Sequence, residues 1–321
     1  MSKKILVYVL ISLNVLLESS CSAAIDLPEA KLTIKVVTED GKPIEGANIA
    51  IGFEVPKENG RGVKSAILKA VTDAHGLITV SNKTLGYIGY EAAKEGYYKS
   101  DGKYSFGSNK NGYWQPRNPE LTVVLRKIEN PIPMYARNAH AFPITVPELR
   151  KSVGFDLIEF DWVSPYGKGK RADFLFKLTS TYNSEVDFDT KLELTFPNKF
   201  DGIQLIKEDR TVGSALKLPR MAPETGYQNK LVRSRSRVPG TPGENDQKED
   251  NNYIFRIRSE EENGKLVRAM YGKIHGDIYV HPPTSIYFKY YLNPDYTRNL
   301  EFNPKKNLFE NIPRGERIGL D

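Results

Sequence analysis

The chain has 321 residues, 39% hydrophobic and 11% aromatic, which is enough apolar material for two domains of ordinary size and a targeting segment. The formal net charge of +6 is spread along the chain, so composition gives no reason to expect a nucleic-acid partner. Because Cys21 is the only cysteine, an intramolecular disulfide and a cysteine-rich zinc site are excluded. No window keeps apolar residues at helical spacing over several turns, so we predict an all-β protein.

Residues 1–24 are predicted to be a signal peptide. Lys3 and Lys4 precede an apolar stretch over residues 5–17, which is too short to span a bilayer comfortably. Ser-Ala-Ala at 22–24 supplies the small residues that a signal peptidase requires. We therefore expect an exported protein that is periplasmic, on the cell surface or secreted.

Cys21 leaves two outcomes open. Residues 17–22, Leu-Glu-Ser-Ser-Cys-Ser, resemble a bacterial lipoprotein processing site, although Glu18 stands where that pattern usually has an apolar residue. Either a lipid on Cys21 anchors the protein, as its only attachment to a membrane, or Cys21 is removed with the signal peptide.

Two turn motifs organise residues 31–127. Asp-Gly-Lys-Pro at 40–43 interrupts apolar-alternating runs, because Gly41 can take a positive φ and Pro43 fixes its own φ. Thr-Asp-Ala-His-Gly at 72–76 separates a second pair of such runs. We predict that Gly46 and Gly76 are structural and intolerant of bulk, as a positive φ would make them, and that this segment folds as a β-sandwich by itself.

These motifs resemble the carboxypeptidase-regulatory-like, transthyretin-like domain. That family combines a Gly-x-Pro-x-x-Gly-Ala turn with Thr-Asp-x-x-Gly and a late Gly-Tyr, and this chain has them at 41–47, 72–76, and 86–87 and 96–97. The resemblance implies a Greek-key, Ig-like sandwich of about seven strands that acts as a non-catalytic accessory module. The chain departs from the family in residues 98–118, which we expect to be a long polar loop.

The rest of the chain matches no family that the motifs identify. Residues 128–147 are predicted to be a Pro-rich linker, and residues 148–321 a second all-β domain, also a β-sandwich. Asp201-Gly202 and Asn263-Gly264 are typical of hairpin turns.

Residues 234–251 are poor in apolar side chains and are predicted to be a mobile surface loop. Arg233, Arg235 and Arg237 could hold a phosphate or a polyanion, but a solvated loop edge is the interpretation that we favour.

The sequence contains no catalytic or metal-binding signature. Its histidines are far apart, and neither Gly-x-Ser-x-Gly nor an Asp-x-Asp-x-Asp-Gly loop is present, so we expect no catalytic residue, no metal and no cofactor. Asp156, Glu159 and Asp161 form the densest acidic group, but on a strand the first two would point to opposite faces. That spacing weakens them as a carboxylate pair for glycan hydrolysis.

Aromatic residues among polar neighbours give the candidate binding residues. Tyr113 and Trp114 follow Asn, Lys and Gly, and Trp162 and Tyr166 repeat the pattern in the second domain. Rigid aromatic faces beside amides and cations suit stacking on sugar rings or a contact with a protein partner. Packing between the domains or beneath the loop is the alternative.

The sequence favours a non-enzymatic binding or structural protein of the cell envelope or extracellular space, with a protein or glycan partner. The alternative is a carbohydrate-active enzyme, or its accessory domain, with a site in residues 148–321. A groove in the second domain that gathers Asp or Glu with aromatics would favour the enzyme. The sequence does not determine the oligomeric state.

Overall fold

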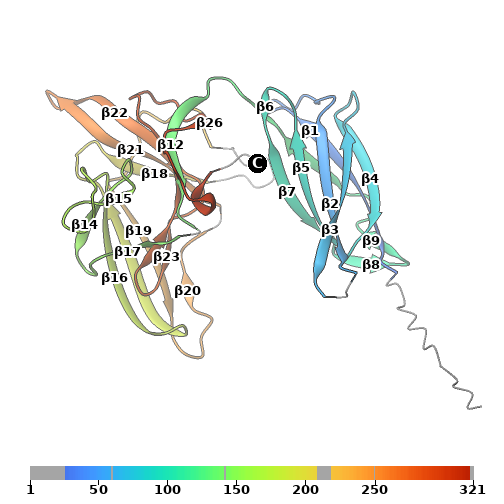
Figure 1. Cartoon of the computed structure of the whole chain (residues 1–321), viewed down its shortest axis with the longest axis horizontal. Helices are drawn as coiled ribbons and strands as arrows, with labels where there is room; N and C mark the ends of the chain where they lie inside the picture. Colours follow the sequence, from blue (N-terminus) through green and yellow to red (C-terminus); the bar gives the residue numbers. More distant parts are fainter. Residues whose placement is uncertain (1–25, 59–60, 141, 208–217, 249, 319–321) are drawn as a thin grey trace, which may run out of the picture.

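The computed structural model describes residues 26–58, 61–140, 142–207, 218–248 and 250–318. The predicted signal peptide and Cys21 lie outside these residues. The described regular structure consists of β-strands and one short 3₁₀ helix, η1 (Arg314–Glu316), which confirms the predicted all-β class with β-sandwich domains. Figure 1 shows two β bodies side by side, one formed by the first part of the chain and one by the remainder.

The N-terminal body consists of two main sheets. The first has the order β10-β1-β9-β8, with β4 also paired to β1, and the second has the order β3-β2-β5-β7. A small two-stranded sheet joins β6 to β11. The strands of the first sheet are β1 (Glu29–Val37), β4 (Leu77–Lys83), β8 (Ser108–Lys110), β9 (Tyr113–Gln115) and β10 (Glu120–Val124). The others are β2 (Asn48–Pro56), β3 (Val63–Val71), β5 (Tyr87–Ala93), β7 (Ser100–Ser105), β6 (Tyr97–Tyr98) and β11 (Arg126–Lys127).

Strict alternation of apolar residues builds this first core. Leu32, Ile34 and Val36 of β1 are fully buried, and Ile49 and Ile51 of β2 meet them from the other sheet. Because successive side chains of a strand point to opposite faces, each of these strands keeps its polar residues on the outside.

The two turn motifs are hydrogen-bonded to each other. The Thr72 hydroxyl donates to the carbonyl of Ile44 at 2.7 Å and accepts from the N–H of Ala47 at 2.9 Å. Gly46 and Gly76 have φ of +67° and +72°, and a Cβ on Gly76 would collide with the carbonyl oxygen of Val36. The motif residues are therefore explained by the fold.

The C-terminal body contains three sheets, of order β18-β21-β22-β25-β12-β26, β15-β14-β16-β17-β19-β20 and β13-β24-β23. The strands of the first are β12 (Ile132–Asn138), β18 (Gly202–Lys207), β21 (Asn251–Glu262), β22 (Lys265–Ile274), β25 (Lys289–Asn293) and β26 (Phe302–Asn307). Those of the second are β14 (Ser152–Asp156), β15 (Asp161–Trp162), β16 (Phe174–Ser184), β17 (Asp187–Thr195), β19 (Lys230–Arg237) and β20 (Glu244–Asn245). The third contains β13 (Ile144–Thr145), β23 (Tyr279–His281) and β24 (Ser285–Tyr287).

Aromatic rings fill the core of the C-terminal body. Phe155, Phe174 and Phe176 of one six-stranded sheet meet Phe255 of the other, and Phe288 closes the cluster. Most of the ring pairs are edge-to-face at centroid distances of 5–6.5 Å, a geometry that adds to the stabilisation from buried area.

Two segments differ from the expectation. Within residues 128–147, β12 lies inside a six-stranded sheet between β25 and β26, because Pro131 and Pro133 fall at its start and leave the later residues free to pair. Residues 98–118, expected to be a loop, form β7 and the β8–β9 hairpin, whose turn is Asn111-Gly112, both with positive φ. The domain limits themselves stay a prediction.

Residues 234–251 also differ from the mobile loop that was expected. Ser234 to Arg237 continue β19, which pairs with β17, and Glu244-Asn245 return as β20. Because these side chains are polar or basic, the strand has no alternating apolar pattern by which it could be recognised in the sequence. Backbone pairing with a core strand stabilises it. Of the two expected hairpin turns, Asn263-Gly264 joins β21 to β22 with positive φ at both residues. Asp201-Gly202 instead opens β18.

Candidate functional site

The first pair of predicted binding residues lies on β9. The Trp114 ring is half-buried against the N-terminal core, 6.4 Å from the Phe106 ring, and its Nε1 donates to the carbonyl of Thr84 at 3.0 Å. The ring of Tyr113 is half-buried beneath the guanidinium of Arg117, 3.6 Å from the ring centroid. These contacts favour a packing role for Trp114.

The second pair lies in the C-terminal body, so the structure does not bring the four residues together. Trp162 is 7% exposed, packs on Phe155 and Phe176, and donates its Nε1 to the carbonyl of Thr145 at 3.0 Å. Tyr166 is half-buried and its hydroxyl bonds to Glu148. Little of the Trp162 ring is therefore accessible to a ligand. Binding at these four residues stays a prediction.

The dense acidic group has a structural role. Asp156 is 2% exposed and accepts from the backbone N–H groups of Ile158, Glu159, Lys170 and Arg171. Burial raises the pKa of Asp156, but these backbone donors outweigh it and hold the net value below the usual one.

Asp156 also belongs to a buried ion-pair cluster. The guanidinium of Arg258 donates to Asp156 at 3.0 Å and, through two nitrogens, to Asp173 at 2.7 and 2.9 Å. Asp173 is 1% exposed, and burial raises its pKa. Asp156 and Asp173 therefore hold β14, β16 and the end of β21 together through internal hydrogen bonds.

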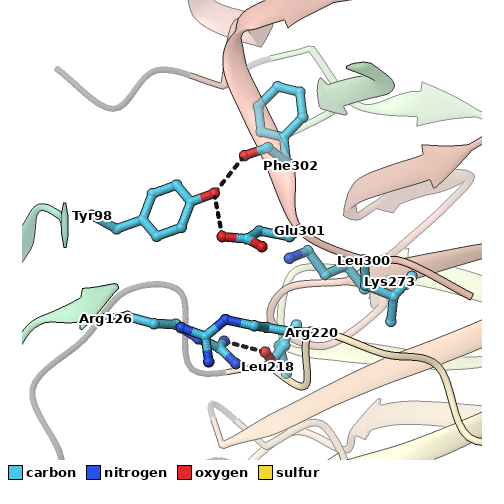
Figure 2. A pocket seen from close by; sticks show the side chains of 8 residues that line it. All are labelled: Tyr98, Arg126, Leu218, Arg220, Lys273, Leu300, Glu301 and Phe302. Atoms are coloured by element: carbon cyan, nitrogen blue, oxygen red, sulfur yellow. Dashed lines mark hydrogen bonds between the residues drawn. The ribbon is translucent and has the colours of Figure 1, made fainter. Parts of the chain in front are cut away.

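A polar cluster joins the two bodies, and Figure 2 shows its side chains. The single hydroxyl proton of Tyr98, on β6, is shared between the carboxylate of Glu301 at 3.2 Å and the carbonyl of Phe302 at 3.1 Å. Glu301 also accepts from the backbone N–H groups of Glu129 and Asn130, at 2.8 and 2.7 Å. The carboxylate of Glu301 therefore ties β6 and the segment after β11 to β26.

Arginines complete this domain junction. Arg126 of β11 donates to the carbonyl of Leu218 and pairs with Glu39 at 3.1 Å, while Arg220 pairs with Glu39 at 2.7 Å. The enclosed space has a volume of about 10 Å³, room for about one water molecule. The junction therefore connects the two bodies through hydrogen bonds and ion pairs, and the space within it is too small for an organic ligand.

Lys273 gives the junction a dependence on pH. It is 4% exposed, and burial, with a further contribution from Arg126 and opposed by Glu301, lowers its pKa to about 7. Above pH 7 the folded state has released this proton while the unfolded chain, with a pKa near 10.5, still holds it. The unfolded state binds more protons in that window, so stability rises with pH.

We predict that wild type gains stability relative to Lys273→Met as the pH rises. Between pH 6 and pH 9 the difference between their unfolding free energies should shift by roughly 2–3 kcal/mol in favour of wild type. Urea unfolding of both proteins at each pH measures this difference. The titration of Tyr98, Tyr291 and the arginines of the junction contributes nearly equally to both proteins, so it drops out when the two free energies are subtracted. A difference that is the same at every pH would contradict the buried, pH-sensitive amine.

A surface groove of about 480 Å³ lies on the C-terminal body, within the size range of ligand sites in proteins. Its aromatic wall comes from β23 and β24, where Tyr279 and Tyr287 are directly opposed, and from His140 after β12. The His140 ring is stacked on Tyr287 with centroids 6.1 Å apart and meets Tyr279 edge-on at 5.6 Å. Burial, with the nearby charge of Lys289, lowers the pKa of His140 and favours the neutral imidazole.

The opposite wall is polar. Arg235 of β19 and Asn245 of β20 are opposed across the strand pair and line the groove, together with Gln247. Gln247 is 8% exposed, and its Oε1 accepts from the N–H of Val280 at 3.4 Å. This contact is long for an N–H···O bond, and it places the amide oxygen of Gln247 toward Val280, because an N–H needs an acceptor.

The amide nitrogen of Gln247 is then left without a hydrogen-bond partner among the described residues. A buried donor without a partner costs free energy, typically about 1–3 kcal/mol, and calls for an explanation. This nitrogen is itself shielded from solvent, so a ligand oxygen in the groove that Gln247 lines would accept this bond only after the Gln247 side chain rotates.

Asp277 holds the polar wall in place. It is fully buried and accepts from Arg233 Nε at 2.8 Å, Tyr253 Oη at 2.6 Å and the N–H of Lys248 at 2.9 Å. Arg233, one of the three arginines considered for a polyanion, is therefore committed to an internal ion pair. Arg235 is the one that faces the groove.

Sequence reasoning missed this groove. His140 and Arg235 were noted for other reasons, and Tyr279, Tyr287, Asn245 and Gln247 carry no motif. The sequence offered one signal, in Tyr-Val-His at 279–281 and Ser-Ile-Tyr at 285–287. In each run a tyrosine and a polar residue are two positions apart, so on a strand both side chains would lie on the same face. Which segment would face them could not be read without the sheet order.

Within the described residues, no group of three or more His, Cys, Asp or Glu side chains is arranged to hold a metal ion. Across the same ranges, no helix has the length and apolar character that a membrane span requires.

Comparison with known proteins gives only distant likeness. The sequence matches no protein-family model and no curated protein. Among solved structures, 3-chlorocatechol 1,2-dioxygenase from Rhodococcus opacus 1CP aligns at 11% identity and a TM-score of 0.26, over 32% of this chain and 60% of that one. This chain thus spans less than two thirds of the dioxygenase's length.

Two pilins align over more of the chain. A streptococcal ancillary pilin matches at 12% identity and a TM-score of 0.22, over 86% of this chain and 62% of the pilin. BcpA, the major pilin subunit of Bacillus cereus, matches at 10% identity and a TM-score of 0.23, over 84% and 83%. These superpositions are too distant to bear on the function of the chain.

Proposed function

We propose that this chain is an exported, non-enzymatic binding protein of the cell envelope or extracellular space, and that the groove beside Gln247 takes an acidic saccharide. The observation that carries the proposal is the lining of this groove, in which an aromatic wall of His140, Tyr279 and Tyr287 faces the polar side chains of Arg235, Asn245 and Gln247.

The chemistry of the groove matches a sugar ring. The C–H face of a pyranose packs on tyrosine and imidazole rings, which removes apolar area from water on both sides. Ring hydroxyls accept from the Gln247 amide and exchange bonds with Asn245. Arg235 is the only charged side chain in the lining, so a carboxylate on the sugar is favoured over a neutral ring.

The same lining argues against hydrolysis. Glycosidases place two carboxyl groups about 5–10 Å apart across the scissile bond. The seven residues that line this groove include neither Asp nor Glu. Recognition without cleavage is therefore the function that the geometry supports best, ahead of a carbohydrate-active enzyme.

The same proposal covers the finer features of the chain. Residues 31–127 would be a carboxypeptidase-regulatory-like module that spaces the binding body from the envelope. Residues 1–24 would direct export, with a lipid on Cys21 as the alternative to release. The buried polar junction supports this arrangement, because it would hold the groove at a fixed orientation to the module.

We expect the mature protein to bind tri-galacturonate more tightly than the neutral trisaccharide maltotriose, as measured by isothermal titration calorimetry. Tyr287→Ala should weaken binding by about tenfold or more, because it removes part of the stacking wall. Gln247→Ala should cost roughly 0.5–1.5 kcal/mol of binding free energy, the worth of one hydrogen bond.

The matched control is Tyr182→Ala, which removes a tyrosine that is 42% exposed on β16, outside the groove lining. It should leave affinity unchanged. Absence of binding to either sugar, or equal losses in Tyr287→Ala and Tyr182→Ala, would contradict the groove as a saccharide site.

A further inference from the structure

Strand β3 is a long edge strand with one side unpaired among the described strands. It is nine residues long and lies at the end of the β3-β2-β5-β7 sheet, where it pairs only with β2 among the described strands. Proteins usually protect such edges with lysine, proline, bulges or short strands, because unpaired backbone groups recruit another strand. Of these devices β3 has only lysine, at Lys64 and Lys69. Residues 63–71 contain no proline, and their pairing with β2 shows no shift of register.

Both faces of this edge are apolar. Val63, Ile67 and Val71 point outward and are 48%, 67% and 54% exposed. Ala66, Leu68 and Ala70 point inward and pack on the N-terminal core, yet stay only partly buried. The margin of the core is therefore open along β3, and another strand placed there would cover it.

The sequence of β3 is complementary to itself. When two copies run antiparallel with Ile67 opposite Ile67 of the partner subunit, Val63 lies opposite Val71 of the partner subunit. On the same face Ser65 lies opposite Lys69 of the partner subunit, so no two like charges meet directly. On the other face Ala66 meets Leu68 of the partner subunit. A shift of one residue would turn the outward apolar row against the core row. A shift of two residues would keep the faces but place Ile67 opposite Ser65 or Lys69 of the partner subunit, so apolar pairing favours the register centred on Ile67.

We propose that this chain forms a symmetric dimer through β3, in which the two four-stranded sheets join into one continuous sheet. The occupant of the edge is thus a second copy of the chain. The contact is isologous and closes on itself, so it yields dimers and no fibres. It is one strand wide and belongs to the small class of interfaces below about 1,200 Å², so the dimer should dissociate on dilution.

The dimer would carry two saccharide grooves, one in each subunit. The groove and β3 lie in different bodies of the chain, so this inference does not depend on the proposed function. Loss of sugar binding in a groove variant would leave dimerisation intact, and loss of the dimer would leave the affinity of each groove intact.

Sedimentation velocity of the mature protein over about 1–300 μM tests the proposal. We expect a concentration-dependent shift from monomer to dimer, which Ile67→Glu abolishes because it places two carboxylates against each other at the centre. The control Val267→Glu, at a valine 59% exposed on β22, should leave the dimer unchanged. A monomer at every concentration, or equal effects of the two changes, would overturn the proposal.

The register has its own test. Ser65→Glu should tighten the dimer by about threefold or more, because it creates two Glu–Lys pairs across the strands, and Ser65→Lys should weaken it by a similar factor. Ser65 is also directly opposite Glu54 on β2, so within one chain Ser65→Glu meets a like charge and Ser65→Lys an opposite one. The effect of each variant on the monomer is therefore opposite in sign to its expected effect on the dimer, and thermal melts at the lowest protein concentration measure the monomer effect separately. Equal effects of the two charges would exclude the register centred on Ile67 and, with it, the dimer proposed.

Discussion

Asp277→Ala should lower the unfolding free energy of the C-terminal body by about 3–5 kcal/mol. The carboxylate is fully buried and is the shared acceptor for Arg233, Tyr253, the Asn251 amide and the Lys248 N–H, at 2.6–2.9 Å. Removing it leaves a half-buried cation and several buried donors without their acceptor, and each such donor costs free energy.

Asp277→Asn is the matched variant. It keeps the shape of the side chain and part of its hydrogen bonding but removes the charge opposite Arg233, so it should lose less stability than Asp277→Ala. Urea unfolding followed by the fluorescence of Trp162, in a Trp114→Phe background, reports on this body alone. If Asp277→Ala unfolds at the same denaturant concentration as the background protein, the carboxylate does not hold the polar wall together.

Trp114→Ala should destabilise the N-terminal body by about 3 kcal/mol, near the lower end for tryptophan truncation because the ring is only half-buried. The ring packs against Phe106 and donates to the carbonyl of Thr84. It also lies so close to Gly86 that a Cβ there would stand 2.8 Å from two ring atoms. The change would therefore open a cavity beneath β9 and leave that carbonyl without its donor.

The control for Trp114→Ala is Tyr87→Ala, which removes an aromatic ring that is 50% exposed on β5 and should change the melting temperature little. The binding hypothesis for Trp114 makes the opposite prediction, an unchanged melt with loss of a glycan or envelope partner. Thermal melts and pull-down on the same variant separate the two accounts.

Residues with a local reason for their conformation could be predicted from the sequence. Gly46, Gly76 and Asn263-Gly264 hold the positive φ that their turn motifs require. The alternation in β1 and β16 placed apolar residues correctly, because one face of each strand is buried and the other is not.

Features that depend on pairing partners could not be predicted. Residues 234–237 carry only Ser and Arg, yet they form the end of β19 because β17 provides a ladder of partners. Residues 132–138 include Pro133 and directly follow Pro131, yet they form an inner strand because β25 and β26 lie on either side.

The groove is the clearest case of such a feature. Its members come from the chain after β12, from β19 and β20, and from β23 and β24, segments that are up to about 150 residues apart in sequence. No spacing rule connects them. The unpartnered amide of Gln247 becomes visible only when its neighbours are placed.

The side-chain amide of Gln247 offers the most direct test of the saccharide site. In a ¹⁵N–¹H spectrum of the mature protein, the NH₂ signals absent from Gln247→Ala identify this group. Titration with tri-galacturonate should shift these signals saturably, with the same affinity that calorimetry gives, while Tyr287→Ala should need at least about ten times more sugar for the same shift. Gln247 NH₂ signals that stay in place while the sugar binds would contradict the account.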